Sequence, residues 1–92
     1  MPLRPVLLDL REYPLCERPM RVLLSLKRLA MGETMVVIDD CDPDPLLKEL
    51  KPALDRGYTY WVAEEGPETW RILISCERSI EDQRETDGRR HD

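Results

Sequence analysis

The sequence predicts a two-layer α+β sandwich (an α/β two-layer sandwich) in the order β-α-β-α-β-β, with a mixed four-stranded sheet and two helices on one face. Three observations predict this fold. Strand-like apolar segments alternate with two amphipathic helical segments, and a crossover through a helix makes the first two strands parallel. Two more strand-like segments then follow each other directly, as in a hairpin. Two helices can cover only one face of four strands, which gives two layers.

The first strand and the first helix have clear sequence patterns. In residues 3–11, Val6, Leu8 and Leu10 lie on one face with the period of a strand, and Pro5 removes an amide donor near its start, which is typical of an edge strand. A helix is predicted from about Arg18 to Met31, with Pro19 in its first turn and Gly32 just beyond its end. Its predicted apolar stripe is formed by Val22, Leu23, Leu26, Leu29 and Ala30.

The second strand and the second helix follow. Residues 33–39 are continuously apolar at their centre and predict an interior strand. Asp42 and Pro43 predict the start of a helix, and Pro52 and Gly57 predict its end. The apolar face of this helix is expected to be Leu46, Leu47, Leu50 and Leu54.

The last ordered elements are predicted to form a hairpin. Residues 58–64 and 68–76 are strand-like, and Gly66 with Pro67 marks the turn between them. Trp61 and Trp70 on these strands are expected to pack against other side chains. Residues 77–92 are mostly charged and are predicted to be a disordered tail, so the folded domain covers residues 1–76.

The composition excludes several classes of function. A net charge of −5 repels phosphate backbones, which argues against nucleic-acid binding. The longest apolar runs are only a few residues, too short to span a membrane. Three cysteines without paired spacing argue against a disulfide framework, and we expect a reducing, cytoplasmic setting.

Two cysteines follow the two predicted parallel strands. Cys16 lies between the first strand and the first helix, and Cys41 lies between the second strand and the second helix, so both are expected at the same edge of the sheet. A helix start favours a thiolate, and Arg11, Arg18 and Arg21 add positive charge near Cys16. Cys41 lies among aspartates, so Cys16 is the better candidate nucleophile. The alternative is that both are inert small residues; Cys76 is expected to be buried at the opposite end.

Other candidate sites are weaker. Met20 and Leu24 form a candidate apolar docking spot beside the first helix, or else they only widen its buried stripe. The aspartates of residues 40–44 have the spacing of a calcium loop, but Pro45 stands where glycine is needed and Lys51 where glutamate is needed. We therefore expect no metal site, and no motif indicates a cofactor.

Three segments carry a resemblance to a known superfamily. "LDLREYPLCERPMRVLLSLKRLAMGETMVVIDD" resembles the start of the TusA/SirA-like sulfur carriers, while "DDCDPDPL" and "GPETWRILI" resemble an uncharacterised branch of that superfamily, a domain of unknown function. The resemblance implies sheet order 1-2-4-3, with the fourth strand antiparallel to the others. In the sulfur carriers, a cysteine in a C-P-x-P motif carries a persulfide. The corresponding segment here reads "LCERP", with Cys16 followed by Glu17 where the motif has proline.

Two functional hypotheses follow. In the first, which the resemblance implies, the protein is a sulfur carrier or relay in which Cys16 accepts sulfur from a donor protein, such as a cysteine desulfurase or rhodanese-like protein, and passes it to an acceptor. In the second, it is a non-catalytic module that binds a partner or ligand at the same sheet edge, with Met20 and Leu24 in the contact.

Overall fold

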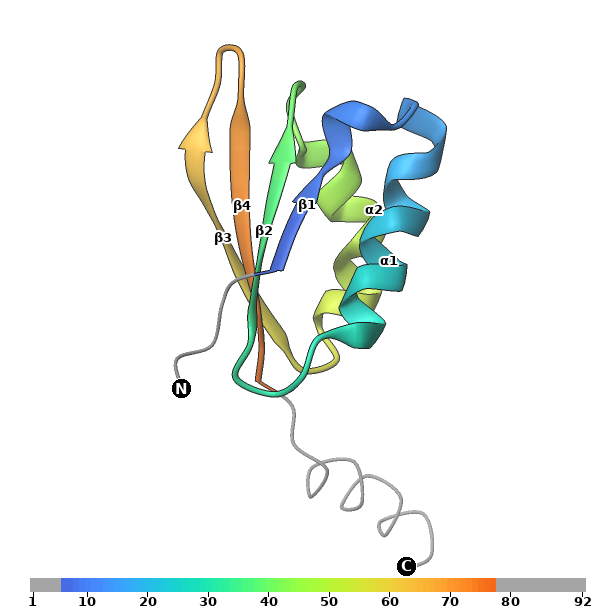
Figure 1. The fold of residues 1–92 in the computed structure, drawn as a ribbon, viewed down its shortest axis with the longest axis vertical. Coiled ribbons are helices and arrows are strands. Elements are labelled where there is room, and N and C mark those ends of the chain that lie inside the picture. Colours follow the sequence, from blue (N-terminus) through green and yellow to red (C-terminus); the bar gives the residue numbers. More distant parts are fainter. Residues whose placement is uncertain (1–5, 78–92) are drawn as a thin grey trace, which may run out of the picture.

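The computed structural model describes residues 6–77 as a four-stranded sheet with two helices packed on one of its faces (Figure 1). The strand order is β1-β2-β4-β3, with β1 parallel to β2 and β4 antiparallel to both of its neighbours. The predicted fold class, element order and sheet order are therefore confirmed. Most of the predicted disordered tail, residues 78–92, lies outside the described residues, as do residues 1–5.

Strand β1 (Val6–Asp9) is an edge strand, as predicted, but it ends earlier than the alternation suggested. The Asp9 carboxylate accepts a hydrogen bond from the Arg11 backbone N–H at 3.1 Å and so starts the short 3-10 helix η1 (Leu10–Glu12). Leu10 belongs to this short helix and not to the strand, and its side chain is completely buried. A second 3-10 helix, η2 (Leu15–Glu17), leads directly into α1.

Helix α1 (Arg18–Arg28) starts where predicted and ends before the predicted Met31. Its last turn is closed by the Leu29 backbone N–H, which donates to the Leu26 carbonyl at 3.1 Å, while Leu29 itself adopts an extended conformation and buries its side chain. Gly32 has a φ of 87° in the following turn and not at the helix end. Ala30 is exposed, so the buried stripe is narrower than predicted.

Strand β2 (Thr34–Asp39) is the interior strand that its apolar centre predicts. Helix α2 (Asp44–Leu54) then begins one residue after Pro43, and the Asp42 carboxylate accepts a hydrogen bond from the Asp44 backbone N–H at 2.9 Å. Pro52 lies in the last turn, and the helix ends before Gly57 as predicted.

Strands β3 (Tyr58–Glu65) and β4 (Trp70–Cys76) form the predicted hairpin. Gly66 adopts a φ of +47° in its turn, and a Cβ atom there would lie 2.6 Å from the Trp70 side chain, so only glycine fits. Trp61 is packed less than predicted, because it is 52% exposed.

The core lies between the sheet and the helices. Its buried side chains come from every layer: Leu10, Val22, Leu26, Leu29, Met35, Val37, Leu50, Leu54, Ile72, Ile74 and Cys76. Each fully buried aliphatic side chain contributes about 1.5–3 kcal/mol relative to an exposed one. Among residues 6–77, neither helix is long and apolar enough to cross a membrane.

Candidate functional site

The turn before α1 and the turn after β2 lie at the same end of the sheet (Figure 1). Cys16 belongs to the first turn and is exposed, whereas Cys41 belongs to the second and is half-buried. Cys76 lies at the other end, because its neighbour Ser75 pairs with Thr34 at the start of β2. The predicted shared edge for Cys16 and Cys41, and the predicted burial of Cys76, are both confirmed.

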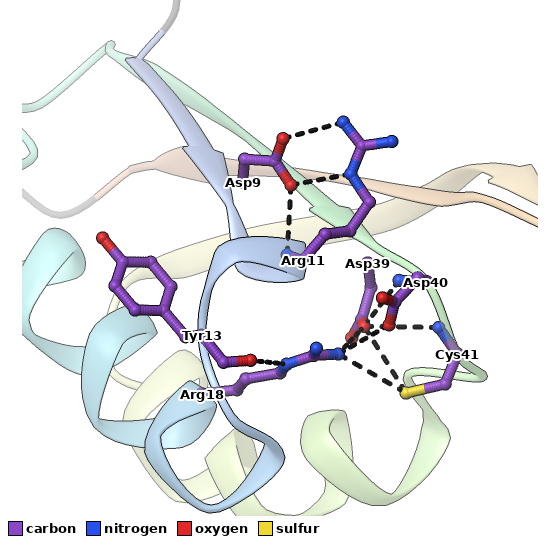
Figure 2. Close-up of polar contacts among 7 residues, drawn as sticks. All are labelled: Asp9, Arg11, Tyr13, Arg18, Asp39, Asp40 and Cys41. Carbon is purple, nitrogen blue, oxygen red and sulfur yellow. Dashed lines mark hydrogen bonds and ion pairs between the residues drawn. The ribbon is translucent and has the colours of Figure 1, made fainter.

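A buried ion pair joins these two turns. Arg18, in the first turn of α1, is 7% exposed, and its Nη1 lies 2.7 Å from Oδ1 of Asp39, which is 1% exposed at the end of β2. The same Nη1 lies 2.9 Å from Oδ1 of Asp40, and Nε donates to the Tyr13 carbonyl at 3.0 Å (Figure 2). Burial alone would lower the pKa of Arg18, but Asp40 and Asp39 raise it.

Cys41 is part of this network. Its thiol lies 3.5 Å from Asp39 Oδ1 as a donor and 3.7 Å from Arg18 Nη1 as an acceptor (Figure 2). Asp39 Oδ1 also accepts from the backbone N–H groups of Asp40 at 2.8 Å and Cys41 at 3.4 Å. Burial and the nearby negative charge of Asp39 raise the pKa of the Cys41 thiol. Cys41 is therefore held by these hydrogen bonds as a neutral thiol.

Asp39, Asp40 and Cys41 could in principle hold a metal ion, since their ligand atoms lie within 4.8 Å of one another. However, Arg18 Nη1 contacts all three side chains and so occupies the centre of the group. The guanidinium already supplies the positive charge that balances these carboxylates. A metal ion would have to displace it.

The other two predicted supporting arginines have partners of their own. Arg11 pairs with Asp9 through Nη2 at 2.7 Å (Figure 2). Arg21 lies 3.4 Å from Glu17 and stacks 4.4 Å over the Tyr13 ring. The structure thus gathers Arg18 and Cys41 into one cluster and engages Arg11 and Arg21 elsewhere.

A cavity of about 310 Å³ opens beside the buried ion pair. Apolar side chains form much of its wall: Leu15, Pro19, Pro45 and Leu46. Arg18 is the only cation in its lining, against the carboxylates of Asp39, Asp42 and Glu49, so the cavity suits a neutral or cationic molecule better than an anion. Within residues 6–77, the hydrogen bonds of the Arg18 side chain run through Nε and Nη1.

The predicted docking residues lie on the exposed side of α1. Met20 is 58% exposed and Leu24 is 45% exposed, so neither belongs to the buried stripe of this helix. Leu15, just before Cys16, is 66% exposed and lines the cavity. Leu15 and Met20 therefore place exposed apolar side chains on both sides of Cys16 in the sequence.

The sequence analysis missed the Arg18–Asp39 pair, although the pattern contains a signal for it. Arg18 precedes Val22 and Leu26 at intervals of four residues, which places it on the core face of α1. Asp39 continues the alternation of Met35 and Val37, which places it on the core face of β2. Two opposite charges on facing core surfaces indicate a buried ion pair.

Comparison with known proteins identifies a family and not an activity. The model of an uncharacterised conserved protein family, DUF2249, matches residues 7–76. Its description does not connect it with sulfur carriers. No curated protein and no solved structure matches the chain significantly. The chain, whose two helices and cavity lie within the matched residues, therefore belongs to the DUF2249 family of uncharacterised conserved proteins.

Proposed function

We propose that this domain is a sulfur carrier in which Cys16 bears the persulfide. The observation that carries the proposal is the exposure of the Cys16 thiol in η2, at the start of α1, between the exposed apolar side chains of Leu15 and Met20. A carrier needs a thiol that a partner's persulfide can reach and a surface on which that partner can dock. The sequence resemblance to the TusA/SirA-like carriers supports a carrier of this fold, while Glu17 stands after Cys16 where their motif has proline.

The transfer step is an exchange without net oxidation. The Cys16 sulfur, as a thiolate, attacks the outer sulfur of a persulfide on the donor protein. A new S–S bond forms on Cys16, the S–S bond of the donor breaks, and the donor cysteine leaves as a thiolate that takes up the proton lost by Cys16. An acceptor thiolate or other nucleophile then removes the outer sulfur from Cys16. This sulfur exchange needs no proton from the three arginines that we expected to support Cys16.

Sulfur loading can be measured directly. The full chain is incubated with glutathione persulfide, blocked with an alkylating reagent and mapped by peptide mass spectrometry. We expect one added sulfur atom on the Cys16 peptide in the wild type and in Cys41→Ser, and none in Cys16→Ser. Loading on Cys41, or unchanged loading in Cys16→Ser, would exclude Cys16 as the carrier residue.

A second candidate function is a non-catalytic binding module, and the exposure of Met20 and Leu24 on α1 favours it. In this case Cys16 is only part of a contact surface.

Oxidation footprinting tests this second function, because the chain contains its own control. Met20 is 58% exposed within α1, and Met31 is 59% exposed beyond the C-terminal end of this helix. In an extract of the cells that produce the protein, a docked partner should protect Met20 and leave Met31 as reactive as in the purified chain. Protection that persists in Cys16→Ser would favour the binding module over sulfur transfer, whereas equal reactivity of both methionines would contradict it.

A further inference from the structure

We propose that the free edge of β3 pairs with the same edge of a second copy of this chain, giving a symmetric antiparallel dimer with a continuous sheet. In the strand order β1-β2-β4-β3, the two edge strands are β1 and β3 (Figure 1). They differ in length: β1 has 4 residues, whereas β3 has 8. The longer edge offers more unpaired backbone donors and acceptors to another strand.

The first part of β3 lacks the features that usually protect an edge strand. Tyr58–Val62 contains no charge, no proline and no glycine, and the bulge between Val62 and Glu64 comes only after it. Tyr60 is 37% exposed and Trp61 is 52% exposed. Aromatic side chains opposite one another across an antiparallel pair stabilise it, and Tyr60 of one copy would lie opposite Tyr60 of the other.

Charge complementarity identifies the partner as a second copy. Arg56 precedes β3 and Glu65 ends it; both are exposed, and neither has an ion pair within residues 6–77. Antiparallel pairing of two β3 strands places Glu65, at the end of each strand, next to the turn that contains Arg56 in the other copy, so the contact occurs twice by symmetry.

A register centred on Tyr60 suits the uncharged first part of β3. With Tyr60 opposite Tyr60, Thr59 of each copy lies opposite Trp61 of the other, on the same face. The interface uses neither Cys16 nor the exposed side of α1, so it is independent of the proposed function.

Sedimentation equilibrium of the full chain, over a series of concentrations, tests the dimer. The apparent mass should rise with concentration from 10.8 kDa towards twice that value. Arg56→Glu replaces two attractions by two repulsions and should raise the dimer dissociation constant about tenfold, whereas Arg56→Glu with Glu65→Arg should restore it. Arg28→Glu, the same charge change on exposed α1, should have no effect. A monomer at all concentrations, or a dimer that Arg56→Glu and Arg28→Glu weaken equally, would overturn the proposal.

Hydrogen exchange gives a second readout that does not depend on a variant. The amides of residues 58–62 that face away from β4 should become more protected as the protein concentration rises, while those of β1 should not change. Protection that is independent of concentration in both edge strands would contradict pairing through β3.

Discussion

The two βα turns of this fold are equivalent in position and opposite in character. Both join a strand to a helix at the same edge of the sheet, and each contains one cysteine. The turn before α1 is built from two 3-10 helices and leaves Cys16 exposed. The turn before α2 is short, and Cys41 is tied there to Asp39 and Arg18. Position at the sheet edge therefore does not decide whether a thiol is accessible.

The two turns also differ in their share of the positive charge of Arg18. Arg18 follows Cys16 by two residues in the sequence, but its guanidinium points across to Asp39, Asp40 and Cys41 (Figure 2). Asp39 is buried and needs a cation, whereas Cys16 is exposed to water and needs none. The arginine nearest to one cysteine thus belongs to the site of the other.

Removing the Arg18 guanidinium should have the largest effect on stability. Arg18→Met keeps most of the side-chain volume but leaves the Asp39 carboxylate buried without its partner, which should lower the free energy of unfolding by about 3–5 kcal/mol. Urea unfolding followed by tryptophan fluorescence measures this. Arg21→Met, at an exposed pair with Glu17, is the matched control and should cost less than about 1 kcal/mol.

A second substitution separates the charge from the packing. In the Arg18→Met background, Asp39→Asn removes the unpaired charge and should recover part of the lost stability. If Asp39→Asn gives no recovery, the cost of Arg18→Met comes from packing alone and the ion pair does not join the turns as described.

The second turn should also have a distinctive pH dependence. Because the pKa of Cys41 is raised in the folded state, the folded chain keeps this proton at a pH where the unfolded thiol, with a pKa of about 8.5, loses it. The stabilisation is full below the unfolded pKa and is lost as the pH rises through the folded pKa. Between these values, wild-type stability should fall relative to Cys41→Ser by at most about 1.4 kcal/mol per pH unit. Parallel urea midpoints for the two proteins across the alkaline range would contradict this.

The smallest effect is expected at the start of the first turn. Arg11 lowers the pKa of Asp9 chiefly through their side-chain hydrogen bond. This stabilisation is present above the unfolded pKa of about 3.9 and is lost as the pH falls through the folded pKa. Asp9→Asn should therefore cost at most about 1 kcal/mol at neutral pH and nothing in strong acid. A cost that persists in acid would show that the charge of Asp9 is not the cause.

The fold could be predicted from the sequence because apolar periodicity and turn residues agree along the chain. Val22 and Leu26 on α1, the apolar centre of β2, and Gly66 in the hairpin each point to the element observed. Element ends were less predictable, because single side chains set them. The Asp9 carboxylate ends β1 early, and burial of Leu29 ends α1 early.

The candidate site could be predicted only in part. Cys16 and Cys41 each follow one of two parallel strands, and the turns after parallel strands lie at the same edge of the sheet, so their shared edge was predictable. The partner of Arg18 is Asp39, which is far from it in the sequence. Because Arg18 is close to Cys16 in the sequence, it was expected to act on Cys16, whereas its guanidinium contacts the turn that contains Cys41. The core-facing pattern of both charges was the signal that could have corrected it.

The account rests on the difference between the two thiols, and alkylation kinetics of the native chain test it most directly. Iodoacetamide labelling at neutral pH is followed for each cysteine by peptide mass spectrometry. Cys16 should react first, because it is exposed; Cys41 should react more slowly, because it is half-buried and its pKa is raised; and Cys76 should react only when the domain unfolds. Labelling of Cys41 as fast as that of Cys16 would contradict the account.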